Sequence, residues 1–120
     1  MDPIELIFDH VGIPVDEKQP QEDWVEATRV WVTDPRKHKY HIEYLRFESD
    51  TPCVGDVVNL PHVAYRVKAA DFPKLLEGAE ILIAPFNVDS NMSIAYVKKD
   101  GMPVEYMVFK DPALWFGKRV

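Results

Sequence analysis

Two histidines and two glutamates are the residues of this chain whose types and spacing could do chemistry together. Each stands among the apolar and β-branched residues that fill a strand, so each is predicted to lie on the inward side of a sheet. An ionised carboxylate buried without a partner shifts its pKa or draws in a counter-charge. A single divalent cation would offset the burial of all four groups, which are His10, Glu43, His62 and Glu105.

The four residues occupy matched positions in an internal repeat. The segment DHVGIPV at 9–15 is similar to PHVAYRV at 61–67, and HIEYLRF at 41–47 is similar to PVEYMVF at 103–109. Each copy begins with a histidine-containing strand and ends with a glutamate-containing strand. A strand unit that cannot bury its own face alone implies that the two copies pack together.

Strands must position these residues, and β-branched and aromatic residues indicate where the strands lie. The predicted strands cover 4–13, 24–33, 39–48, 60–67, 80–86, 92–99 and 102–110. The polar stretch 14–23 contains two prolines and excludes a long regular element, and 49–59 is a connector. The pair Asp100-Gly101 predicts a hairpin turn. Strands outnumber helices, so the predicted fold class is α+β, built around a sheet.

One helix is predicted, at 71–78. Asp71 can cap its start, Pro73 is tolerated in its first turn, and Gly78 can end it. The interval from histidine to glutamate is ten residues shorter in the first copy, which is about the length of this helix. The helix of the first copy is therefore predicted to be shortened or absent.

Alternation along a strand decides which residues share a face with the two histidines. It places His10 with Leu6 and Phe8, and His62 with Ala64 and Arg66. An arginine on that face is suited to bind a substrate carboxylate or phosphate, so Arg66 is the predicted substrate-binding residue. The alternative, that the strand ends there and Arg66 reaches solvent, stays open.

Composition limits the class of protein and its partners. The 120 residues are 47% hydrophobic and 28% charged, which fits one domain, 1–120, made of modules at about 1–50 and 58–120. The net charge of −6 argues against nucleic acid and anionic membranes as partners. Cys53 is the single cysteine, so no intrachain disulfide forms. A cytoplasmic homodimer that binds a small molecule is the expectation.

The segments FDHVGIPV, HIEYLRF, LPHVAYRV and GMPVEYMVF together resemble the vicinal oxygen chelate superfamily, and are most similar to its glyoxalase I and methylmalonyl-CoA epimerase branches. This resemblance implies paired βαβββ modules that form a curved mixed sheet, shaped as a cup. It also implies a metal held by residues of the first and last strands of each module. His10 and Glu43 would be the ligands from the first module, and His62 and Glu105 those from the second.

Imidazole and carboxylate ligands suit a divalent zinc, nickel, cobalt, manganese or iron ion, and the sequence does not choose among them. A Lewis acid at such a site stabilises the charge that develops when a proton is removed beside a carbonyl. The resemblance implies that Glu105 moves this proton, and Glu43 is the second predicted catalytic residue. A fourth protein ligand would crowd oxygen chemistry, so a proton-transferring isomerase, epimerase or lyase is favoured over a dioxygenase.

A second class of function stays open at this stage. The bleomycin-resistance branch of the same superfamily binds small molecules without chemistry, and a shortened first module could open the cup to water. Retention of all four ligand-type residues favours the enzyme. His41 shares the face of Glu43, so it is either another ligand, a partner that orients Glu43, or a residue of the cup's rim.

Overall fold

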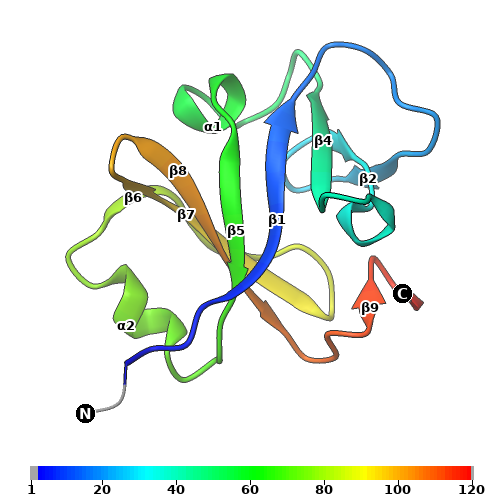
Figure 1. Ribbon diagram of the computed structural model, residues 1–120. Coiled ribbons are helices and arrows are strands. Elements are labelled where there is room, and N and C mark those ends of the chain that lie inside the picture. The colour runs from blue at the N-terminus through cyan, green and yellow to red at the C-terminus, as the bar shows by residue number, and fades with distance from the viewer. Residues whose placement is uncertain (1–2, 120) are drawn as a thin grey trace.

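The computed structural model describes residues 3–119, which form one large sheet, a small second sheet and three short helices (Figure 1). The large sheet contains β1 (Ile7–Pro14), β2 (Asp23–Val25), β3 (Val30–Val32), β4 (Ile42–Phe47), β5 (His62–Arg66), β6 (Glu80–Asn87), β7 (Met92–Lys99) and β8 (Met102–Phe109). The small sheet pairs β9 (Leu114–Trp115) with β10 (Lys118–Arg119), and the helices are η1 (Pro35–Lys37), α1 (Asp56–Asn59) and α2 (Phe72–Leu76). This confirms the α+β class.

The large sheet is built from two equivalent halves. Its strand order is β2-β3-β4-β1-β5-β8-β7-β6, and the halves meet where β1 and β5 pair antiparallel, side by side at the centre of the molecule (Figure 1). In each half the first strand is parallel to the last one, as β1 is to β4 and β5 is to β8. The sheet is curved and mixed, as the resemblance of the sequence implied.

The register of the two parallel pairs is also equivalent. Gly12 is paired with Glu43 in the first half, and Ala64 is paired with Glu105 in the second. Gly12 and Ala64 each lie two residues after a histidine of the repeat. The backbone therefore places both histidine–glutamate pairs in the same relation, and the predicted repeat is a repeat of structure.

The halves differ in their helix. In the second half, α2 packs its apolar residues on the outer face of the sheet, against Val97 and Val104. No helix forms in residues 15–22, which join β1 to β2, so the predicted loss of the first helix is confirmed. Asp71 occupies the N-cap position of α2, but its side chain makes no capping hydrogen bond and lies 3.7 Å from Nζ of Lys74.

One expected strand and one expected connector differ from the structure. The stretch 24–33 was expected as one strand, but it folds into the β2–β3 hairpin around a turn at Glu26–Arg29. The hairpin lets Val25, Val30 and Val32 pack together inside the cup. The connector 49–59 also contains a helical turn, α1, whose Val57 enters the core.

The inner face of the sheet is covered by the C-terminal hairpin. Trp115, on β9, is 2% exposed and belongs to the main core cluster. Arg36 holds this segment in place, because it donates a 2.6 Å hydrogen bond to the carbonyl of Pro112 and stacks on the Trp115 ring. The cup is thus filled by side chains. Within residues 3–119, the helices are all too short to cross a bilayer.

Candidate metal centre

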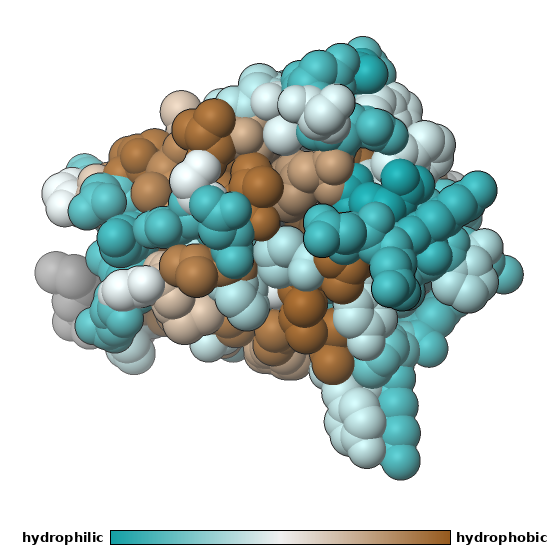
Figure 2. Space-filling model, turned by 90° about the horizontal axis from the view of Figure 1, so that it is seen from above, coloured by the Kyte–Doolittle hydropathy of each residue, from teal (hydrophilic) through white to brown (hydrophobic). Residues whose placement is uncertain are grey.

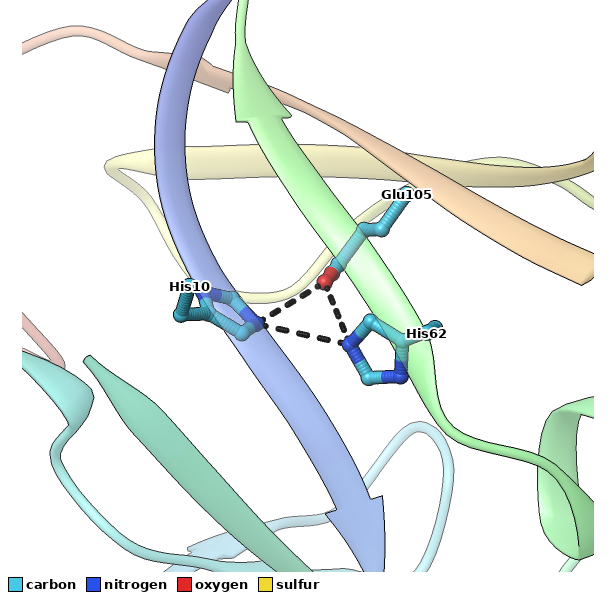
Figure 3. Close-up of side chains that lie close together, drawn as sticks. All are labelled: His10, His62 and Glu105. Atoms are coloured by element: carbon cyan, nitrogen blue, oxygen red, sulfur yellow. Dashed lines mark hydrogen bonds and ion pairs between the residues drawn. The ribbon is translucent and has the colours of Figure 1, made fainter. Parts of the chain in front are cut away.

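Three of the predicted ligands converge on one point inside the sheet. His10 comes from β1, His62 from β5 and Glu105 from β8, and their side chains point toward one another (Figure 3). Glu105 Oε1 lies 3.3 Å from His10 Nε2 and 3.2 Å from His62 Nε2, and the two Nε2 atoms are 3.4 Å apart. All three residues are buried, and their donor atoms come together within a single chain.

The geometry of the cluster fits a metal ion. Donor atoms about 2.1 Å from one ion, at tetrahedral angles, lie about 3.4 Å from each other, and the three observed separations are close to this value. Glu105 Oε1 is buried and makes no well-formed hydrogen bond within the described chain. Lone pairs that converge in this way repel one another unless a cation or a proton lies among them. The donor set, two imidazoles and a carboxylate, suits a divalent transition metal.

Small residues opposite each histidine make the cluster possible. Across the β1–β5 pairing, His62 faces Gly12 and His10 faces Ala64. A Cβ atom added at Gly12 would lie 2.0 Å from Cε1 of His62, which is inside the ring's own volume. The glycine in FDHVGIP is therefore required by side-chain packing, since it leaves the space that the second histidine occupies.

A buried carboxylate that was not predicted orients His10. The pairing of β1 with β5 shifts between Phe8 and His10, so Asp9 lies in a bulge and both Asp9 and His10 point inward. Asp9 Oδ2 is 2.7 Å from His10 Nδ1, which directs Nε2 toward the cluster. The expected grouping of His10 with Leu6 and Phe8 is wrong for the same reason, because those two residues are exposed.

Two basic residues balance the charge of Asp9. Its Oδ1 atom lies 3.2 Å from a terminal nitrogen of Arg36 and 3.3 Å from Nε of Arg66. Burial raises the pKa of Asp9, but its contacts with His10 and Arg36 outweigh that effect and lower it. Asp9 is therefore a carboxylate, and only the adjacency of Asp9 and His10 in the sequence could have indicated it.

The charges of the cluster depend on one another. Burial lowers the pKa of His10, but the charge of Glu43 and contacts with Asp9 and Glu105 outweigh burial and raise that pKa well above its ordinary value. Burial raises the pKa of Glu105, and the contacts with both imidazoles reverse this and bring it to about 2. Burial, followed by the charge of Glu105, raises the pKa of Tyr96. The site thus combines an ionised carboxylate with a neutral phenol.

Glu43, the fourth predicted ligand, contacts the cluster on one side only. Its Oε1 atom is 3.4 Å from His10 Nε2, but it is not among the donor atoms that all lie within 4.8 Å of each other. The equivalent backbone register brings Glu43 to the site. The position between the two imidazoles is taken by the side chain of Glu105, so the structure groups three of the four residues.

Arg66 and His41 lie outside the cluster. Arg66 shares a hollow with Phe8, His41 and Arg36, where its guanidinium contacts Asp9. His41 is exposed, and its Nδ1 atom is 3.1 Å from the carbonyl of Asp9. Neither residue lines the interior cavity beside the cluster. Asp9 lies between Arg66 and the cluster, because one of its carboxylate oxygens contacts Arg66 and the other contacts His10.

A small cavity adjoins the cluster on the inner side of the sheet. Its volume is about 40 Å³, and its polar lining includes Glu43, Glu105, Tyr96 and Trp115 amid apolar side chains. Trp115 Nε1 is buried and has no hydrogen-bond partner within residues 3–119. A cavity needs about 10–15 Å³ to hold one water molecule, so this one accommodates an ion's open coordination positions and a few ligand atoms.

The fold and the cluster together define a class: a two-module α+β protein with a buried His–His–Glu group at the junction of its halves. A crystal structure of a hypothetical protein from Bacillus halodurans C-125 is similar to this chain, with a TM-score of 0.63 and 16% sequence identity, over 92% of this chain and 99% of that one. At this identity the similarity shows the fold alone. Comparisons with models of protein families and with characterised proteins gave no match.

Proposed function

We propose that this protein is a metal-dependent isomerase, epimerase or lyase of the vicinal oxygen chelate type. The observation that carries the proposal is the convergence of His10, His62 and Glu105 from equivalent strands of two modules. The substrate would be a small molecule with adjacent oxygens, such as a dicarbonyl, a 2-oxo acid or a thioester. A bound divalent ion would supply Lewis acidity to stabilise negative charge on those oxygens.

The remaining roles in the proposed reaction belong to residues in and around the cluster. His10, His62 and Glu105 would hold the ion, and Asp9 fixes the orientation of His10. Glu43 is the better placed of the two glutamates to accept a proton beside the carbonyl, because it contacts His10 alone while Glu105 lies between both imidazoles. Trp115 is buried and lines one wall of the cavity, so its ring limits the surface through which solvent reaches the site.

Elemental analysis of the purified protein, repeated after reconstitution with zinc, nickel, cobalt, manganese and iron(II), tests the metal. We expect about one ion per chain in the wild type and none in His62→Ala, with circular dichroism unchanged. His38→Ala is the matched control, because His38 lies in the loop at 38–41 and outside the cluster. A wild type that stays metal-free after reconstitution would contradict the proposal.

A binding module of the bleomycin-resistance type is the second candidate function. The narrow cavity and the Trp115 hairpin that covers it favour this alternative, since both restrict turnover of a substrate. Exchange of carbon-bound hydrogen with deuterated water separates the two. An enzyme would exchange a proton beside a carbonyl of its ligand and lose this exchange in Glu43→Gln, whereas a binding module would hold the ligand without exchange.

A further inference from the structure

The interior cavity is too small for a whole substrate, and its walls indicate where the rest would lie. About 40 Å³ holds a few atoms, so any larger ligand with oxygens at the cluster must extend outside. A surface groove of about 380 Å³ shares Thr28, Cys53 and Ile83 with the cavity wall. The groove and the cavity are therefore neighbours separated by three side chains.

The groove is apolar and open to solvent. Its walls come from the β2–β3 turn, the connector before α1 and the edge strand β6, and include Ala27, Pro52, Val54, Leu82 and Phe86. Val54 is 79% exposed, the largest exposed fraction among the exposed large apolar residues of the described chain. Apolar side chains that gather in an open groove are typical of a binding surface.

Neither the groove nor the cavity has a cationic wall. The charged side chains that line the cavity are Glu43 and Glu105, and the groove lining contains no charged residue. A charged group in the groove, away from the ion, would lose its hydration without a counter-charge. Arg66, the residue predicted to bind an anionic substrate, faces a different hollow and is engaged by Asp9.

We propose that the ligand of this site places its adjacent oxygens at the His10–His62–Glu105 cluster and an uncharged, apolar substituent in the groove beside Val54 and Leu82. This inference rests on the proposed function and narrows its substrate class. Ligands with a charged group at the far end of this substituent, such as phosphorylated compounds, are disfavoured. Dicarbonyls and hydroxyketones with a hydrocarbon chain are favoured.

Alkyl hydroxamates test the inference, because their two adjacent oxygens chelate a metal and their chain length can be varied. With the zinc-loaded protein, isothermal titration calorimetry should show affinity rising about fourfold for each added methylene, from acetohydroxamate to hexanohydroxamate, as expected for burial of about 0.8 kcal/mol per CH₂. A carboxylate at the chain end should abolish this gain. Equal affinity across the series would overturn the inference.

Two matched variants test where the alkyl chain of the hydroxamate lies. Val54→Asp puts a charge in the groove at an exposed position, and Ile81→Asp puts one on β6 at a position outside the groove lining. We expect Val54→Asp to remove the dependence on chain length while acetohydroxamate affinity stays within twofold of wild type. Ile81→Asp should behave as wild type.

The outcomes separate this inference from the function on which it rests. If acetohydroxamate binds and the longer chains bind no better, the groove assignment fails and the metal-site proposal survives. If the longer chains bind better and Val54→Asp does not affect them, the chain lies elsewhere and the groove assignment also fails. If the zinc-loaded protein binds no hydroxamate at all, both proposals fail.

Discussion

The two halves of the sheet have kept the same inner face and acquired different outer faces. On the inner side, Glu43 and Glu105 have equivalent registers, and a small residue faces each histidine. On the outer side, α2 covers the second half with apolar contacts, whereas the first half borders a polar hollow of about 820 Å³. Seen from above, the side of the second half shows most of the apolar residues and the side of the first is mainly hydrophilic (Figure 2).

Corresponding residues of β4 and β8 show how the first half tolerates the loss of its helix. Arg46 corresponds to Val108 in the repeat. Val108 is part of the apolar layer under α2, whereas Arg46 pairs with Glu22 of the loop that replaces the helix, at 2.7 and 3.0 Å. A polar outer face needs no cover. The difference teaches that the shared constraint on both modules lies at the inner face, where the cluster forms.

The largest expected effect breaks the equivalence of the two glutamates. Glu105→Gln removes the carboxylate that lies between the imidazoles. We expect the affinity for zinc to fall by more than about 100-fold, which exceeds the usual effect of losing a residue that only orients a metal ligand. Glu43→Gln should lower it by less than about tenfold, because Glu43 contacts His10 alone. Competition with a chromophoric chelator measures both, and equal losses would mean that Glu43 is a full ligand.

The next effect concerns the small residues that face the histidines. Gly12→Ala places a Cβ atom inside the volume of the His62 ring, so we expect the affinity for zinc to fall about 10–100-fold while the fold is retained. Ala64→Gly, at the equivalent position, only opens space and should leave zinc affinity unchanged. Circular dichroism provides the control for folding. Wild-type affinity in a folded Gly12→Ala variant would contradict the packing argument.

Much of this arrangement could be predicted from the sequence, because similar segments in the two halves form strands with equivalent pairing. The histidine and glutamate strands, the hairpin at Asp100-Gly101 and the missing first helix follow from spacing and turn chemistry. Asp9 could not be predicted, since a bulge interrupts alternation without a local signature. The cover provided by Trp115 could not be predicted either, because it depends on a tertiary contact with Arg36.

The affinity for zinc should depend on pH through His10, whose pKa Glu43 and Glu105 both raise. The pKa of His10 is higher in the folded chain than in the unfolded chain, where it is about 6.5. The proton on His10 therefore stabilises the metal-free fold below about pH 6.5, and this stabilisation is lost as pH rises through the pKa of the folded state. A metal competes with this proton, so zinc affinity should increase about tenfold per pH unit up to that value.

Glu43→Gln provides the control for this pH dependence. The charge of Glu43 is the largest of the effects that raise the pKa of His10, so its removal should shift the rise in zinc affinity to lower pH. Zinc titrations between pH 5 and about 8 measure the shift. The lowered pKa of Glu105, about 2, acts in the opposite direction: its contribution to stability is present above its ordinary value of 4.5 and is lost as pH falls from there toward 2. If the pH dependence of zinc affinity were the same in Glu43→Gln as in the wild type, Glu43 would not be a cause of the raised pKa of His10.

The smallest expected effect tests the two outer faces. Leu75→Ala removes part of the apolar contact between α2 and the sheet, and should lower the free energy of unfolding by about 1–2 kcal/mol for a half-buried leucine. Arg46→Ala removes an ion pair whose arginine side chain is 21% exposed, and it should lower the free energy of unfolding by less. The difference from wild type should shrink in 1 M salt, because salt screens the pair. Urea and thermal unfolding monitored by circular dichroism give both quantities. If Arg46→Ala destabilised the chain more than Leu75→Ala, the loop at 15–22 would be an essential replacement for the helix, and the outer face of the first half would be as constrained as that of the second.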